Sequence, residues 1–189
     1  ESVYAALLFP ERTKAIEKVF CREARGKPYI GNIDFKTLTS QVREVSDGFI
    51  NSVDWERCGL AGFSICLCQL TSSLYFVKRI KERSPNLAIV VGGSMFAGDS
   101  ARNLFQVFPE IDFVVNGEGE LPLSQLIRHL TDSQSNEEVP PIPGIVTRAT
   151  TRDKPHVSFC QMETLSKLPP PDYDDYFHML KTFSPQKTF

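Results

Sequence analysis

Three short apolar runs, each followed by a segment with helical spacing, constrain the fold of this chain more than any other feature. The runs are Leu60–Ile65, Ala88–Val91 and Phe113–Val115. Short apolar runs of this kind are typical of strands that are buried on both faces of a sheet. Because helices separate the runs, successive strands are expected to be parallel. The sequence therefore predicts an α/β fold, a Rossmann-like open parallel sheet with flanking helices.

The helices that follow these strands are visible in the spacing of their apolar residues. Apolar side chains three or four positions apart lie on one face of a helix. The first of the three helices shows this spacing at Leu70, Leu74, Val77 and Ile80. Asp99–Phe108 and Leu121–Leu130 are the other two predicted helices.

Residues 1–57 are predicted to form a helical segment that packs on the sheet. Thr13–Ala24 has the pattern of a polar helix that ends at Gly26 and Pro28. A longer helix is indicated by one apolar face, made by Phe35, Leu38, Val42, Val45 and Phe49.

Residues 58–132 form the predicted α/β core, and residues 133–189 depart from its pattern. This last part is expected to hold a loop, a β-hairpin and a linker. The two strands of the hairpin are predicted at Ile145–Thr147 and His156–Phe159, and the linker at the proline-rich Pro169–Phe177.

Composition excludes several classes of protein. Among 189 residues, 21 are Lys or Arg and 23 are Asp or Glu, a formal net charge of −2. This balance predicts neither a nucleic-acid partner nor a membrane partner. The five cysteines are odd in number and irregularly spaced, which argues against a secreted disulfide framework and favours a reducing cytoplasm.

The candidate ligand site lies where the predicted strands end. In open α/β sheets, ligands bind in the crevice beyond the carboxyl ends of the strands. Three such ends share one edge if the strands are parallel: Ser64–Gln69, Gly92–Phe96 and Asn116–Glu120.

Gly92-Gly93 has two interpretations. Glycine lets the backbone approach a flat or bulky ligand, and the small Ser64 and Ser94 can hydrogen-bond a ligand without filling its space. Alternatively, the two glycines only form a tight turn from strand to helix. The short pattern by itself favours the turn.

The run Gly117-Glu118-Gly119-Glu120 is also open to two interpretations. Glu120 fits the first turn of a helix, where the helix dipole favours an acid. Glu118 can accept hydrogen bonds from amide or hydroxyl groups of a ligand. The run is no phosphate loop, because it lacks the Gly-Lys-Ser/Thr ending and its acids repel phosphate.

The cysteines and histidines predict no metal site and no catalytic group. Cys66 and Cys68 would face the same way on a strand, and small apolar packing is favoured over a soft-metal site. No further Cys or His lies near them in sequence. His129, His156 and His178 are assigned surface or hydrogen-bonding roles, because none has a companion at metal-ligand spacing.

The order of these motifs resembles the cobalamin-binding domain of cobalamin-dependent radical-SAM enzymes. The resemblance extends over residues 58–177. Within this family, the chain resembles the radical-SAM maturases of ribosomally made peptides, many of which are regarded as C-methyltransferases. The segments that resemble the family domain are Leu60-Ala61-Gly62-Phe63-Ser64, Val90-Val91-Gly92-Gly93-Ser94, Asp112–Glu120, Pro143-Gly144-Ile145 and Leu168–Tyr173.

The resemblance implies a corrinoid over the strand ends, with its nucleotide tail between the sheet and a helix. The residues it assigns to cofactor binding are Ser64, Cys68, Gln69, Gly92, Gly93, Ser94, Gly117 and Glu118. The chain lacks the Asp-x-His-x-x-Gly loop that supplies a histidine to cobalt in some cobalamin proteins. The expected cofactor is therefore base-off cobalamin without a histidine ligand.

Two departures from the family bear on what the chain can do. The family domain opens with one or two strand–helix units that are not seen here, which would leave an unpaired sheet edge and a route to a homodimer. The Cys-x-x-x-Cys-x-x-Cys motif is absent, so the 4Fe–4S cluster and S-adenosylmethionine are expected only in a radical-SAM barrel outside this chain. The chain alone is then not expected to be an enzyme, whereas its parent would methylate a carbon of a peptide or small molecule.

Two other functions remain open at the level of sequence. One is a cofactor-free α/β interaction or regulatory domain, and the other is a nucleotide-binding fragment. A phosphoacceptor domain needs an Asp at one strand end and a Lys at a later one, which Gly92-Gly93 and Gly117-Glu118 do not supply. The missing phosphate loop argues against nucleotide binding.

Overall fold

The centre of the molecule is a four-stranded sheet in the order β1-β2-β3-β4. The computed structural model describes residues 1–96, 100–132, 139–153, 158–162, 164, 166 and 168–182. The strands are β1 (Leu60–Ser64), β2 (Ala88–Gly92), β3 (Phe113–Val115) and β4 (Ile145–Val146). β1, β2 and β3 run parallel, as predicted, and β4 pairs antiparallel with β3.

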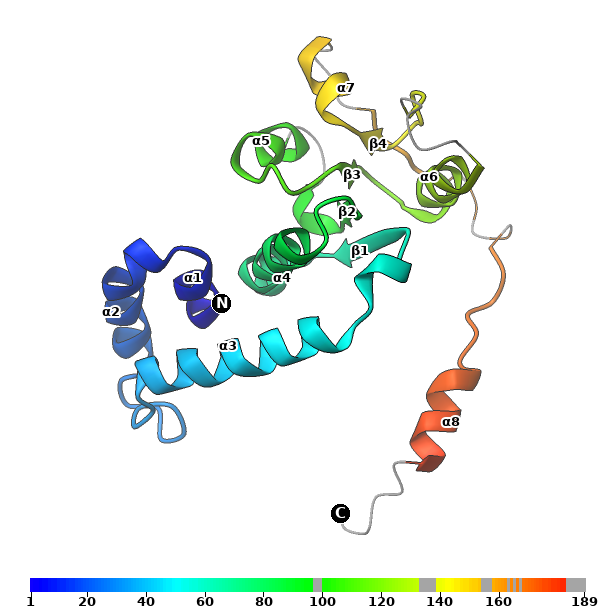
Figure 1. Ribbon diagram of the computed structural model, residues 1–189. Coiled ribbons are helices and arrows are strands. Elements are labelled where there is room, and N and C mark those ends of the chain that lie inside the picture. The colour runs from blue at the N-terminus through cyan, green and yellow to red at the C-terminus, as the bar shows by residue number, and fades with distance from the viewer. Residues whose placement is uncertain are drawn as a thin grey trace.

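Both faces of the sheet are covered, which explains why the strands are apolar throughout. Ile89 and Val91 of β2 face a core shared with α4 (Leu70–Arg83) and α5 (Ser100–Val107). Val90 faces the opposite side, in a second core with Leu126 of α6 (Glu120–Asp132). Figure 1 shows α4 and α5 on one side of the strands and α6 on the other. The Rossmann-like architecture expected from the sequence is confirmed.

Three helices precede the sheet: α1 (Ser2–Leu8), α2 (Thr13–Ala24) and α3 (Phe35–Ser52). α1 packs on α4, and a carboxylate oxygen of Glu1 accepts a 3.0 Å hydrogen bond from the Thr71 amide in the first turn of α4. Asp34 caps α3 by accepting from the Thr37 amide at 2.7 Å, and its hydrogen bonds with Thr37 lower the pKa of the Asp34 carboxyl. Short 3-10 helices lie at Pro10–Arg12, Trp55–Arg57, Leu67–Gln69 and Ser94–Phe96.

The buried face of α3 differs from the prediction. Phe35 is buried as expected, but Val45 and Phe49 are 74% and 57% exposed. Ser46 and Ile50 are buried instead. α3 contacts α1, α2 and α4, and on this face the Ser46 and Tyr4 hydroxyl oxygens lie 3.0 Å apart.

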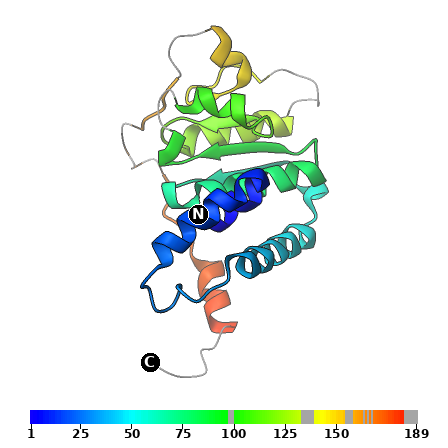
Figure 2. The same ribbon diagram turned by 90° about the vertical axis from the view of Figure 1, so that its left-hand side faces the viewer.

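The C-terminal part also departs from the prediction. Among the residues that the structure describes, β4 pairs with β3 and not with a second hairpin strand, and Val115 lies opposite Ile145. The chain then forms α7 (Arg148–Asp153). Residues 133–138 of the expected loop and 156–157 of the expected second hairpin strand lie outside the described residues. A helix, α8 (Asp174–Thr182), begins within the expected linker and continues beyond it, and it lies apart from the sheet in Figures 1 and 2.

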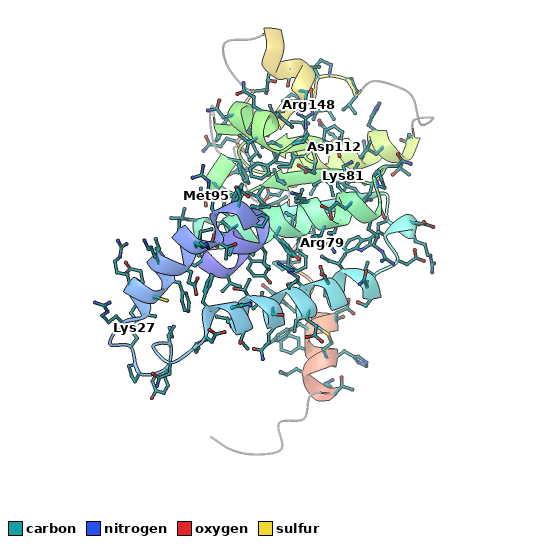
Figure 3. The ribbon with its side chains drawn as sticks, turned by 60° about the vertical axis from the view of Figure 1, so that its left-hand side comes forward. Lys27, Arg79, Lys81, Met95, Asp112 and Arg148 are labelled. Atoms are coloured by element: carbon teal, nitrogen blue, oxygen red, sulfur yellow. The ribbon has the colours of Figure 1, made fainter. Side chains whose placement is uncertain are left out.

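Arg148 explains why the chain turns into α7 beside α5. Its guanidinium donates hydrogen bonds to the carbonyl oxygens of Phe105, Pro109 and Ile111 at 2.6, 2.8 and 2.9 Å. It also lies over the Phe105 ring, 5.1 Å from the ring centre. Phe105 lies in the last turn of α5, and Pro109 and Ile111 follow the helix, so the guanidinium sits at the helix C-terminus, where a positive charge is favourable. Figure 3 shows Arg148 between these two elements.

An ion pair and two hydrogen bonds link the residues at the amino-terminal ends of β2 and β3. Lys81 of α4 forms an ion pair of 2.9 Å with Asp112, and it donates to the Leu87 carbonyl at 2.6 Å. Asp112 in turn accepts from the Ile89 amide at 2.8 Å. Figure 3 shows Lys81 and Asp112 directed toward each other. The strand ends that border the candidate site lie at the opposite edge of the sheet.

β1 lies at the outer edge of the sheet. Within the described residues, β2 is the strand that pairs with it. Self-association through this edge stays a prediction. No described helix is both long and apolar enough to cross a bilayer.

Candidate functional site

A cavity of about 450 Å³ opens at the carboxyl edge of the sheet, on the face that α6 covers. Strands β1, β2 and β3 all contribute to it, together with the turn between β3 and α6. Its lining consists of Gly62, Phe63, Ser64, Val90, Val91, Gly92, Gly93, Val115, Gly117, Gly119 and Leu123. The cavity therefore lies at the edge where an open parallel sheet binds its ligands.

Glycines in the lining, which have no side chain, create much of this space. Leu60, Gly62 and Ser64 alternate along β1 with Ala61 and Phe63, which pack toward α4. Gly62 therefore faces α6, and a Cβ added to it would meet only the Val90 side chain, at 3.6 Å. A Cβ on Gly119 would likewise meet only Val115, at 3.6 Å. Glycine leaves space at both positions that a side chain would fill.

A second cavity of about 450 Å³ continues the first along α6. Its lining consists of Gly59, Leu60, Gly62, Val90, Leu123, Ile127, Leu130 and Thr131. Gly62, Val90 and Leu123 line both cavities. The two spaces thus form one trench, with β1 and β2 as its floor and α6 as its wall. We call it the α6 trench.

Gly92-Gly93 is required by the protein's own backbone and also borders the α6 trench. Gly93 has a φ of +105°, and a Cβ there would lie 2.5 Å from the Ile65 carbonyl oxygen. A Cβ on Gly92 is tight, at 3.2 Å from Cβ of Val115. The close turn inferred from the sequence is present, and it places the main chain of both glycines in the cavity wall.

The structure separates the predicted site residues into two groups. Ser64, Gly92, Gly93 and Gly117 lie together in the lining of the cavity. The other four are not among the residues that line it: Cys68, Gln69, Ser94 and Glu118. Ser94 is exposed at the start of its 3-10 helix, and Gln69 uses its side-chain oxygen to accept from the Cys66 amide at 3.2 Å.

The packing role predicted for Cys66 and Cys68 is wrong, because both are exposed. β1 ends at Ser64, and the chain turns at once into the 3-10 helix that contains Cys68. The two thiols therefore lie at the surface, in and just before a 3-10 helix, and not on one face of a buried strand.

Glu118 is engaged by the protein itself. Its carboxylate accepts a hydrogen bond from the Met162 amide, and its own amide donates to the Cys160 carbonyl at 2.9 Å. The expected role of Glu118 as a hydrogen-bonding group for a ligand is untested, and the structure supplies a different partner for its carboxylate.

Sequence reasoning missed Gly62, Gly119 and Leu123 as parts of the site. A signal existed for Gly62, because a glycine inside a strand often marks a close approach of a ligand or backbone. Leu123 had no such signal, because a leucine on a helix face looks the same whether it faces a core or a cavity.

The α6 trench suits binding better than catalysis. None of the described residues that line it is ionisable. The lining offers apolar side chains, main-chain groups and the hydroxyls of Ser64 and Thr131. In the described part of the chain, no group of three or more His, Cys, Asp or Glu could hold a metal ion. His156 lies outside that part. These features fit a ligand with an extended apolar part.

Comparison with known proteins gives two partial similarities and no match to a protein family. The chain is 26% identical over 114 residues, 60% of its length, to the cobalamin-dependent radical SAM methyltransferase TokK of Streptomyces tokunonensis. It is 35% identical over 82 residues, 43% of its length, to the anaerobic magnesium-protoporphyrin IX monomethyl ester cyclase of Synechocystis sp.. The matched parts span only 15% and 14% of these two relatives. A search of protein families found none that matches the chain.

Proposed function

We propose that this chain is the cobalamin-binding module of a larger radical-SAM protein. The observation that carries the proposal is the α6 trench, an apolar channel with a glycine floor between the sheet and α6. The sequence resemblance assigns the nucleotide tail of a corrinoid to such a channel. Similarity to a cobalamin-dependent radical SAM methyltransferase supports the same class of ligand.

The residues present fit the nucleotide tail of a corrinoid in three respects. The trench is extended, because two adjoining spaces share Gly62, Val90 and Leu123. Its walls are apolar, as the benzimidazole base requires. At the mouth, Gly92, Gly93 and Gly117 present main chain without side chains, so that a bulky ring can approach closely.

In this proposal the protein's own residues bind and orient. When bound, cobalamin supplies a cobalt centre that can carry a methyl group. Leu123, Ile127 and Leu130 of α6 exclude water from the tail, and the Ser64 hydroxyl offers one hydrogen bond at the mouth. We propose that cobalt receives no histidine ligand from this chain, because no Asp-x-His-x-x-Gly loop is present in the sequence.

Methyl transfer belongs to the larger protein. We propose that a radical-SAM barrel with its 4Fe–4S cluster and S-adenosylmethionine acts beside this module, on a carbon of a peptide or small molecule. The proposal is supported by the similarity to TokK. The matched region spans 15% of the length of TokK. The described residues that line the α6 trench include no titratable side chain, which suits a module that binds the cofactor and leaves the reaction to the larger protein.

Corrinoid retention tests the proposal directly. The purified chain is incubated with hydroxocobalamin, desalted, and titrated with the visible spectrum as the readout. We expect one bound corrinoid per chain, with the spectrum of the base-off form. Cobinamide, which lacks the nucleotide tail, is the matched ligand and should bind more weakly. A chain that retains neither corrinoid would contradict the proposal and favour the cofactor-free interaction domain.

A further inference from the structure

The turn Asn116–Glu118 holds a distant segment of the chain, Ser158–Met162. The Cys160 amide donates to the Asn116 carbonyl at 3.0 Å, and the Glu118 amide donates to the Cys160 carbonyl at 2.9 Å. Gly117 and Cys160 therefore pair as a parallel bridge. The segment lies beside the end of β3 like one residue pair of a further strand.

Two side chains of the same turn extend this pairing in both directions. The Asn116 side chain is fully buried, and its Nδ2 donates to the Ser158 carbonyl at 2.9 Å. On the other side of Cys160, the Glu118 carboxylate accepts from the Met162 amide. Because the residues are 42 and 44 positions apart, local chain geometry does not bring them together. Hydrogen bonds to an ionised carboxylate are stronger than those between neutral groups.

Two glycines are needed for the segment to approach so closely. Gly117 has a φ of +103°, and a Cβ there would overlap the Cys160 carbonyl oxygen. Gly144 has a φ of +83°, and a Cβ there would lie 2.5 Å from the Cys160 Cβ. The Gly144 amide also donates to the Ser158 hydroxyl at 3.0 Å. Both glycines are thus explained by contact with Ser158–Met162.

The same turn forms part of the α6 trench. Gly117 of the turn and the following Gly119 both line the cavity, on either side of Glu118. Any movement of Ser158–Met162 away from the turn would release the backbone that shapes this wall. The chain continues from the segment to α8, so the turn also fixes where the C-terminal part of the chain leaves the sheet.

We propose that Asn116 and Glu118 are positioning residues of a latch, which we define as these two side chains with the segment Ser158–Met162. A closed latch holds the trench mouth in shape and fixes the exit of the C-terminal part of the chain. A ligand in the trench and a closed latch then stabilise each other, because coupling between two sites is reciprocal. The coupling rests on the proposed function, whereas the latch itself does not.

Hydrogen exchange tests the latch without any ligand. We compare the chain with Glu118→Ala, Glu118→Gln and the control Glu120→Ala, which removes an exposed acid two residues away. Loss of a charge-assisted hydrogen bond should speed amide exchange across 158–162 by about tenfold or more in Glu118→Ala. Glu118→Gln keeps an acceptor oxygen and should restore part of the protection. Glu120→Ala should leave this segment unchanged.

The behaviour of β2 separates the latch from general destabilisation. Exchange of the β2 amides should stay at the wild-type level in every variant. Unchanged exchange at 158–162 in Glu118→Ala would overturn the latch. An equal increase in β2 and in the segment, with no rescue by Gln, would also overturn it, because Glu118 would then only stabilise the fold.

Corrinoid binding tests the coupling. We expect hydroxocobalamin to slow exchange at 158–162 in the wild-type chain, and Glu118→Ala to bind it at least several-fold more weakly. Equal affinity in both would overturn the coupling while leaving the proposed function intact. A wild-type chain that binds no hydroxocobalamin would overturn both, and the exchange of the free chain would still decide the latch.

Discussion

Gly62→Ala should separate folding from ligand binding in the α6 trench. Gly62 lies in the middle of β1, faces α6 and lines both halves of the trench. The added methyl meets only the Val90 side chain at 3.6 Å, an ordinary contact distance. The free chain should therefore accept alanine without strain, whereas a ligand in the trench should collide with it.

The two effects have opposite signs. Alanine loses less backbone entropy on folding than glycine, so the free energy of unfolding should stay level or rise by about 0.5–1 kcal/mol. In the complex, one extra methyl group in a filled site costs about 1–3 kcal/mol. The dissociation constant for hydroxocobalamin should then rise roughly 5- to 150-fold.

Denaturant unfolding and spectral titration measure these two quantities separately. Gly48→Ala is the matched control, because Gly48 lies on α3 with no atom within 4 Å of an added Cβ. It should gain a similar stability, about 1 kcal/mol, and bind hydroxocobalamin with wild-type affinity. If Gly62→Ala folds normally and binds as tightly as Gly48→Ala, the ligand does not occupy the trench above β1, and the reasoning is refuted.

Three further predictions concern the fold around the site. Gly93→Ala should lower the free energy of unfolding by about 2–4 kcal/mol in a denaturant titration, because its φ of +105° and the Ile65 backbone leave no space for Cβ; a loss below 1 kcal/mol would contradict this. Arg148→Ala should cost about 2–4 kcal/mol by the same measurement, because several backbone carbonyls lose their donor, and Arg148→Lys should recover only part. Burial, then the nearby Asp47, raises the pKa of Tyr75 above its ordinary value of 10.0. Its contribution to stability should be complete below pH 10.0 and be lost as pH rises through the raised pKa, and Tyr75→Phe should flatten this fall in a pH series of thermal unfolding.

Local pattern was enough for most of the secondary structure. The helix Thr13–Ala24 and the strand Phe113–Val115 appear with the predicted bounds, and the parallel order of the first three strands follows from the helices between them. These features depend on residues close together in sequence, whose spacing decides which face is apolar. Prediction was wrong where a helix packs on only part of its surface, as the exposed Val45 and Phe49 of α3 show.

The candidate site was predicted only in part. Position at a strand end identified Ser64, Gly92, Gly93 and Gly117, which line the cavity. The same reasoning placed Cys68 and Gln69 with them, but a 3-10 helix directs the chain away after β1. The sequence shows where a strand ends and not the direction in which the next residues turn.

The sequence by itself determined the class of fold, the edge of the sheet where the candidate site lies, and three of the glycines that border it, Gly92, Gly93 and Gly117. Only the tertiary structure decided that α6 leaves the face of β1 open at Gly62, and that the Glu118 carboxylate meets the Met162 amide. The physical reason is distance along the chain. Hydrophobic periodicity acts over a few residues, whereas the α6 trench and the latch join segments that are tens of residues apart and meet only when the sheet has formed.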